Sequence, residues 1–318
     1  MSDADANRIT QTTLSAYSKV LERAYLEANV LLEKSKAKGK LFMGSSGLDA
    51  RWKVKTAKNG NFQTFSMNDK VAWSSTDNIV EAVLDYGRYR SNDFLFEFEE
   101  LQNRGNESQI INLKAQKIQD LADDFMLDLA AKFWTGVSST ANEMDGLEAA
   151  LPIVTTGTYA GIAKSNSYWQ NNILDGDAGV NSTFATDAVE RIETAKLNAS
   201  HGGAGGEPDW AICAKPVFAI IAQRHTQGER YQAVSERRIG GRALIVHDME
   251  FYHDTNCTAA VTYLMNSKYI EVHSMYDSMF KITQDEGKSP SGTAYHIAAY
   301  PLLKITQPRY FATIKNCT

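Results

Sequence analysis

The sequence has no feature of a membrane-spanning or secreted chain. No apolar run approaches the ~20 residues that a helix needs to cross a bilayer. The opening residues, MSDADANRIT, are polar and acidic, so we expect no secretory signal. The three cysteines, Cys213, Cys257 and Cys317, are odd in number and far apart, which predicts neither a disulfide framework nor a CxxC metal site. These absences together indicate synthesis in a reducing cytoplasm.

A surplus of basic charge is also lacking. The 318 residues carry a formal net charge of −5, whereas proteins that bind nucleic acid tightly neutralise its phosphates with a basic surface. This argues against a dedicated nucleic-acid binder. The chain is 43% hydrophobic and 22% charged, with only six prolines, which is typical of a globular protein with one large or two medium domains. The sequence shows neither an internal repeat nor a low-complexity tract.

The common motifs of nucleotide binding and catalysis are missing. The stretch SHGGAGGE at 200–207 lacks the Lys-Ser or Lys-Thr of a P-loop, and its glycines follow a predicted helix, so we expect a surface loop. There is no HExxH and no GxSxG. Cys213 lies in the apolar strand DWAICA, where a free cysteine usually packs as a small hydrophobe. A catalytic triad assembled from distant residues stays open as an alternative.

One run of histidine and aspartate could suggest a metal site. It contains His247, Asp248, His253 and Asp254. We interpret this run as a single strand, in which the two histidines share a face but lie ~20 Å apart. The sequence therefore predicts no metal site, and no motif in it calls for a cofactor.

Two long helices are predicted. Apolar residues recur at helical period over residues 9–36, lysines crowd the end of this segment, and Gly39 follows as a stop. This helix is either an ordinary core helix or an arm that packs on a neighbouring subunit. The second helix, 106–135, has the stronger apolar stripe, and Gly136 fits its C-terminal cap. About 30 residues make a rod of roughly 45 Å, and few compact enzymes of this size need so long a helix.

The region between these helices predicts strands of opposite charge. Residues 51–58 carry four basic and no acidic side chains, whereas residues 93–100 carry four acidic and no basic ones. Alternation places Arg51, Lys53 and Lys55 on one face of the first strand; in the second, Phe94, Phe96 and Phe98 share a face, and Glu97 and Glu99 share the other. The two strands could pair with each other, pair with another subunit, or form a solvated hairpin face.

The second half of the chain predicts a mixed α/β domain. A helix over 183–198, the buried strand DWAICA and a helix from Pro216 to about residue 230 are followed by a series of strands. Several arginines gather in the polar stretch after the second helix, among them Arg230, Arg237 and Arg238. This stretch is either a solvated loop or a ring of ion pairs between subunits.

The most distinctive segment follows the 106–135 helix. It runs from Asp145 to Ile173, DGLEAALPIVTTGTYAGIAKSNSYWQNNI, with a Thr-Gly-rich loop and the adjacent aromatics Tyr168 and Trp169 but no catalytic constellation. This segment resembles the corresponding stretch of tailed-phage major capsid proteins, which have the Hong-Kong-97-type shell fold. The order of segments along nearly the whole chain supports the resemblance.

The resemblance implies an α+β fold in five segments. We expect an N-terminal arm with a helix (1–47), an extended β-hairpin loop region (48–104), a peripheral domain (105–181) that includes the spine helix (106–135), an α/β axial domain (182–292), and C-terminal strands that return to the peripheral domain (293–318). Tyr168 and Trp169 would then anchor a structural joint. The expected contacts between subunits are Arg51, Lys53, Lys55, Glu97, Glu99, Arg230, Arg237 and Arg238.

The implied function is a coat protein rather than an enzyme. Copies would assemble through hexamers and pentamers into an icosahedral virion shell, in the host cytoplasm, around double-stranded DNA that a mildly acidic wall does not hold. A portal protein is an implied partner, and a decoration protein is a further candidate. Only about 45 residues precede the hairpin region, so we expect a separate scaffolding protein or assembly guided by the N-terminal arm itself. The alternatives are an encapsulin-type nanocompartment shell and a soluble α/β enzyme with an unrecognised active site.

Overall fold

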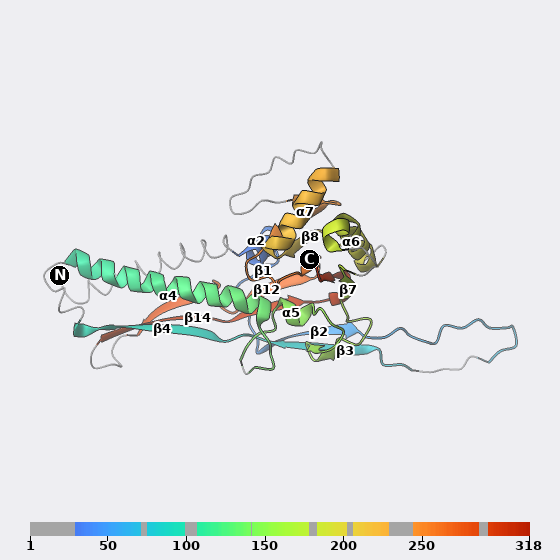
Figure 1. Cartoon of the computed structure of the whole chain (residues 1–318). Coiled ribbons are helices and arrows are strands. Elements are labelled where there is room, and N and C mark those ends of the chain that lie inside the picture. The colour runs from blue at the N-terminus through green and yellow to red at the C-terminus, as the bar shows by residue number, and fades with distance from the viewer. Residues whose placement is uncertain are drawn as a thin grey trace.

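A computed structural model describes residues 29–70, 75–98, 107–140, 142–177, 183–201, 206–228, 244–285 and 292–318. The molecule is elongated (Figure 1). A long helix and the strands beneath it extend to one end, and a two-stranded hairpin with a long loop extends to the other. No helix in these ranges is long and apolar enough to cross a membrane.

A six-stranded sheet forms the core of one half of the molecule. Its order is β7 (Asn172–Asp175), β16 (Ala312–Lys315), β11 (Thr262–Met265), β8 (Trp210–Cys213), β10 (Met249–His253) and β9 (Leu244–Val246). Two helices, α6 (Phe184–Ala199) and α7 (Lys215–Gly228), contact each other and this sheet. Because β8 and β11 are buried throughout, they contain apolar residues on both faces.

The long helix α4 (Glu107–Thr135) lies where residues 106–135 predict one. It packs on a second sheet, of order β13 (Lys281–Asp285), β14 (Gly292–Ala299) and β4 (Tyr89–Phe96). The predicted apolar stripe is buried from Leu121 through Phe125 and Leu129 to Phe133. At 1.5 Å per residue, 29 residues give a helix of about 44 Å.

The basic and acidic strands do not pair with each other. The basic strand β2 (Asp49–Lys55) pairs antiparallel with β3 (Ile79–Asp85), whereas β4 pairs with β14. The phenylalanine face predicted for 93–100 is confirmed for Phe94 and Phe96, whose ring centres lie 4.9 Å apart, and is wrong for Phe98. Strand β4 ends at Phe96, so Glu97 and Phe98 lie beyond it, and Leu95 is the residue that enters the core. Phe96 is 56% exposed, so the face of β4 that carries the phenylalanines points away from the core.

A third sheet has the order β1 (Leu41–Phe42), β12 (Ile270–Ser274) and β15 (Pro301–Ile305). Before it, α2 (Val30–Ala37) begins at Asn29, whose side chain accepts a hydrogen bond from the amide of Leu32, and Gly39 follows the helix with φ +68°. The rest of the helix predicted over 9–36 lies outside the described residues. The remaining elements are α5 (Leu147–Ala150), β5 (Thr158–Tyr159), β6 (Ile162–Ala163) and the 3-10 turn η1 (Pro308–Tyr310).

Sheet membership crosses the boundaries expected for the five segments. Strands β7 and β16 lie outside residues 182–292, yet both hydrogen-bond into the six-stranded sheet. Strand β13 lies inside that range, yet it pairs with β14. Pairing between distant strands has no signature in local composition.

The run that includes His247 and His253 is two strands instead of the single strand expected. His247 and Asp248 have φ values of +50° and +62° and form the two-residue turn between β9 and β10. A turn with two positive φ values matches the right-handed twist of the flanking strands, which favours it in hairpins. No cluster of three or more metal-ligating side chains occurs within the described ranges.

Candidate functional site

Trp169 is the centre of the predicted joint. Its side chain is fully buried, and its indole Nε1 donates a hydrogen bond to the carbonyl oxygen of Tyr159 at 3.1 Å. The indole lies 5.9 Å from the Tyr159 ring and 6.2 Å from the Trp52 ring. The Tyr159 hydroxyl in turn accepts a hydrogen bond from the amide of Ile305 at 2.9 Å. Trp169 therefore links the base of the hairpin, the loop after the long helix, and β15.

Tyr168 has a different position from its neighbour. It is half-buried, and the Arg309 guanidinium carbon lies 5.3 Å from the centre of its ring. Its amide donates to the side-chain oxygen of Asn166 at 3.0 Å. Only one of the two aromatics predicted as anchors therefore lies in the core, and Tyr168 covers the edge of the joint.

Backbone segments meet closely where α4 ends. The amide of Gly146 donates to the carbonyl oxygen of Gly136 at 2.8 Å. A Cβ atom on Gly146 would lie 2.5 Å from the Trp134 carbonyl oxygen, and one on Gly136 would lie 2.5 Å from that of Met144. Both glycines are thus needed for close approach. Asp145, which directly precedes Gly146, is buried, and its carboxylate accepts a hydrogen bond from the amide of Ser138 at 2.7 Å.

Lys164 is a fully buried lysine within the joint. Its ammonium nitrogen donates to the carbonyl oxygens of Ala150 and, at 3.5 Å, Trp169, and it lies 5.1 Å from the centre of the Tyr159 ring. Burial lowers the pKa of Lys164 to about 7, although the nearby Asp145 carboxylate opposes this shift. Keeping the Lys164 side chain charged in this site of carbonyl groups and aromatic faces therefore costs free energy.

Lys164 should make stability depend on alkaline pH. Because its folded-state pKa is about 7 and its ordinary value is 10.5, the unfolded chain binds more protons between these values. The contribution of Lys164 to stability should therefore rise with pH across this window, by on the order of 3 kcal/mol. The buried thiols act in the opposite sense at alkaline pH, so the contribution of Lys164 is read as the difference between the parent chain and Lys164→Met. Urea unfolding at pH 7 and pH 10 measures it. Lys53→Met, at an exposed site, is the matched control; the same pH dependence in Lys164→Met as in the parent chain would contradict the assignment.

The predicted contact residues of the hairpin are on its surface. Arg51, Lys53 and Lys55 are exposed on β2, while Val54 is buried. The Arg51 guanidinium donates hydrogen bonds to the Asp49 carboxylate and lies 3.8 Å from Glu81. The hydrogen bonds from Arg51 lower the pKa of Asp49. Lys53 and Lys55 thus offer the freer basic charges of this face. Glu97 is exposed; Glu99, Arg230, Arg237 and Arg238 lie outside the described residues.

The loop between β2 and β3 exposes large apolar side chains. Phe62, Phe65 and Met67 are 90%, 79% and 102% exposed, in a loop that extends away from the body (Figure 1). A local turn shapes this tip, since the amide of Ser66 donates to the Asp69 carboxylate at 2.6 Å and the amide of Asp69 donates back to the Ser66 carbonyl oxygen at 2.9 Å. Isolated soluble chains rarely hold such a group in water.

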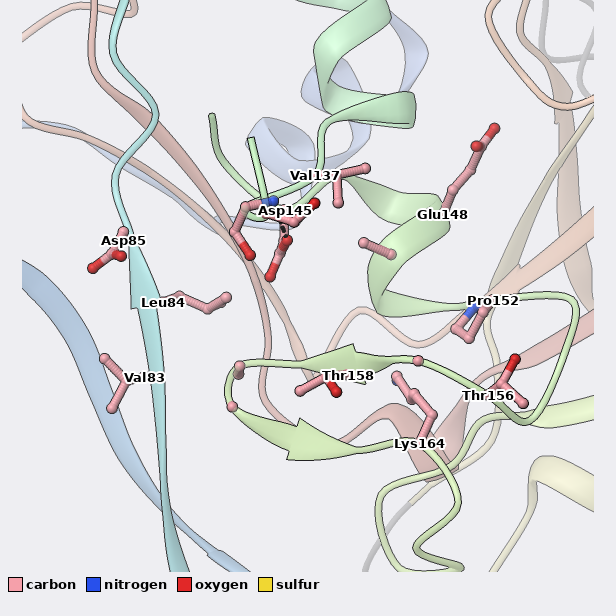
Figure 2. A pocket seen from close by; sticks show the side chains of 16 residues that line it. Val83, Leu84, Asp85, Val137, Asp145, Glu148, Pro152, Thr156, Thr158 and Lys164 are labelled. Atoms are coloured by element: carbon pink, nitrogen blue, oxygen red, sulfur yellow. Dashed lines mark hydrogen bonds between the residues drawn. The ribbon is translucent and has the colours of Figure 1, made fainter. Parts of the chain in front are cut away.

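A groove of about 660 Å³ lies beside the joint (Figure 2). Strand β3 forms one wall with Leu84 and Asp85, and the segment after α4 forms another with Val137, Asp145 and Glu148. The loop from Pro152 to Thr158 and Lys164 complete it. Its chemistry is apolar with an acidic edge, and it contains no nucleophile paired with a general base.

The residues missed by sequence reasoning are Lys164, Trp52 and the apolar hairpin tip. Lysines are normally exposed, so nothing local marks Lys164 as buried. The tip had a signal in the sequence, because Phe62, Phe65 and Met67 follow the Asn59-Gly60 turn dipeptide without any strand partner for an apolar face. All three cysteines are buried, as expected for the Cys213 strand, and burial raises the pKa of each thiol.

Comparison with known proteins finds relatives by structure alone. No protein-family model matches the chain, and no curated protein matches its sequence. The capsid asymmetric unit of cyanophage A-1(L) superposes with a TM-score of 0.66 at 15% identity, covering 89% of this chain and 92% of that one. The capsid of Myoviridae phage XM1 gives 0.55 at 11% identity, covering 88% and 91%.

A third similar structure is the capsid of a native GTA particle, with a TM-score of 0.53 at 8% identity, covering 89% of this chain and 90% of that one. Each of these similarities covers nearly nine-tenths of the chain. At identities this low, the superpositions establish the fold alone. The chain therefore has the Hong-Kong-97-type fold of tailed-phage capsid subunits.

Proposed function

We propose that this protein is a major capsid protein, which assembles through hexamers and pentamers into the icosahedral shell of a tailed virus around double-stranded DNA. Its role is structural rather than catalytic. A portal protein, a separate scaffolding protein and a decoration protein are the partners that such a shell would use. Assembly in the host cytoplasm agrees with three buried, unpaired cysteines.

The observation that carries the proposal is the hairpin loop. It places apolar side chains at the far end of an extended arm, where nothing in the described part of the same chain covers them. Burying apolar surface yields roughly 25 cal/mol per Å², so three such side chains strongly favour a contact with another molecule. An arm that projects beyond its own core is suited to contact a neighbouring copy in a closed ring.

Charge supports a shell that does not bind its contents. The net charge of −5 gives the wall little affinity for phosphates. Contacts repeated around each ring and between rings add to one another, so individually weak contacts can hold a closed particle together. Lys53 and Lys55 on the hairpin are the basic groups that we assign to contacts between subunits.

Imaging of the purified protein tests the proposal. We expect sedimentation in the megadalton range and uniform closed particles or capsomers by negative-stain microscopy. Particles from infected cells should contain nuclease-protected DNA; protein cargo in its place would favour a nanocompartment shell. A chain that stays a small oligomer under every condition, including with its scaffolding protein, would overturn the proposal.

A further inference from the structure

Arg309 is a cation held between aromatic rings without an acidic partner. Its guanidinium carbon lies 5.3 Å from the ring centres of both Tyr168 and Tyr310. Its buried Nε has no hydrogen-bond partner, and no carboxylate forms an ion pair with Arg309, among the residues that the structure describes. A guanidinium stacked on rings keeps donors in its plane, and these bind a carboxylate through two hydrogen bonds. Arg309 is therefore suited to a carboxylate from another molecule.

The surroundings of Arg309 add charge and aromatic surface. Tyr269 stacks on Tyr310, with ring centres 4.7 Å apart, and the Lys268 ammonium nitrogen lies 5.6 Å from the Tyr269 ring centre. The His201 ring contacts Tyr310 edge-on, and burial together with the Arg309 charge lowers the pKa of His201, so this ring is neutral near pH 7. We name this surface the arginine–tyrosine patch; it consists of Tyr168, His201, Lys268, Tyr269, Arg309 and Tyr310.

The outer face of α4 carries a strip of carboxylates. The strip consists of four exposed residues, none of which forms an ion pair within the described ranges: Asp120, Asp123, Asp124 and Asp128. Two lysines of the same helix are paired elsewhere, since Lys117 Nζ lies 3.8 Å from Asp93 and Lys132 Nζ lies 2.6 Å from Glu143. Like charges three and four residues apart on a helix repel each other. This repulsion destabilises the isolated subunit, and a cationic surface placed against the strip would relieve it.

We propose that the arginine–tyrosine patch of one subunit binds the acidic strip of α4 on a second copy of this chain. This inference rests on the proposed function and names one contact between its subunits. The two surfaces lie apart in a single chain, because the side chain of Asn172 in β7 donates to the Arg309 carbonyl oxygen at 2.7 Å and β7 lies past the C-terminal end of α4 (Figure 1). A contact between two different surfaces closes into a ring when the rotation fits.

The rings of the patch favour a carboxylate over the phosphate of a nucleic acid. Single strands bind where bases can stack on open ring faces. In this patch Tyr269 and Tyr310 stack on each other at an interplanar angle of 9°, and the Arg309 guanidinium lies over Tyr168 and Tyr310. The net charge of −5 also disfavours phosphate binding, whereas every copy of the chain supplies the acidic strip.

Charge reversal tests the proposal. Arg309→Glu should raise the protein concentration needed for assembly by about tenfold or more, because like charges would then face each other. Asp124→Arg, at the middle of the strip, should restore assembly of Arg309→Glu towards the parent concentration. Glu190→Arg, on the exposed face of α6, is the matched control and should not restore it. Sedimentation over a dilution series measures the effect, and equal failure of the two second substitutions would contradict the pairing.

A conservative variant gives a second readout. Arg309→Lys keeps the charge and introduces an amine that a carbodiimide can join to a carboxylate in contact with it. Assembled Arg309→Lys particles should show links between position 309 of one chain and residues 120–128 of another, located by mass spectrometry of the peptides. Asp120→Asn, Asp123→Asn, Asp124→Asn and Asp128→Asn together should remove these links.

The outcomes separate this inference from the proposed function. Closed particles without a link from position 309 to the strip would overturn the contact and leave the capsid function intact. Arg309→Gln particles that form at the parent concentration but contain less DNA would overturn it in favour of nucleic-acid binding. Absence of particles from the unmodified chain would remove both.

Discussion

Trp169→Ala is expected to lower the free energy of unfolding by about 4 kcal/mol and to prevent particle formation. The indole is fully buried, and removing it leaves a cavity between the rings of Trp52 and Tyr159. It also leaves the carbonyl oxygen of Tyr159 without the indole hydrogen bond. Because these contacts join the hairpin base to β15, the loss should spread from the core to the orientation of the hairpin.

Tyr168→Ala is the matched control for this substitution. The half-buried phenol contacts Arg309 at the surface of the joint, so its removal should cost about 1 kcal/mol and leave particles intact. Denaturant unfolding of the isolated subunits and negative-stain microscopy measure the two effects. If Trp169→Ala assembled as well as Tyr168→Ala, the joint would have no special role in holding the hairpin.

Gly146→Ala should be nearly as damaging, at about 3 kcal/mol or more, although it adds a single methyl group. Its backbone has φ −82°, which alanine adopts freely, so strain in φ is not the cause. The added Cβ would lie 2.5 Å from the Trp134 carbonyl oxygen and 2.8 Å from the Gly136 nitrogen. Both are backbone atoms at the end of α4, and neither can rotate away.

Gly60→Ala provides the control for the effect of a glycine change alone. Gly60 lies in the hairpin loop, where an added Cβ would meet no atom within 4 Å. Its substitution should change the midpoint of thermal unfolding little, whereas Gly146→Ala should lower it by many degrees or yield insoluble protein. Equal thermal midpoints for the two variants would show that the backbone crossing at Gly136 and Gly146 tolerates expansion.

Local patterns predicted the helices well and the strand partners poorly. The stripe in α4 is set by residues three and four apart, so periodicity was enough to find it, and the predicted resemblance to the shell fold is confirmed for the architecture. The partner of β4 is β14, some 200 residues later, and no local rule relates them. The assignment of 247–253 to one strand failed because His and Asp can adopt the positive φ that glycine usually supplies in a turn.

Site prediction met the same limit. Trp169 was identified through the resemblance to the shell fold, and its burial agrees with an anchoring role. Lys164 was passed over because charge normally excludes a lysine from the core, and only the carbonyl groups and rings that surround it in three dimensions explain its place. The groove is made of three separated segments, so it exists only after folding.

The position of β16 has a consequence for the time at which a subunit becomes competent to assemble. This strand comes after all the others in sequence, yet it lies between β7 and β11 in the six-stranded sheet. During synthesis, β7 therefore has no parallel partner until residues 312–315 have been added to the chain. Nascent chains should hold this sheet incomplete until those residues emerge, so synthesis itself delays association between neighbouring chains on one messenger RNA.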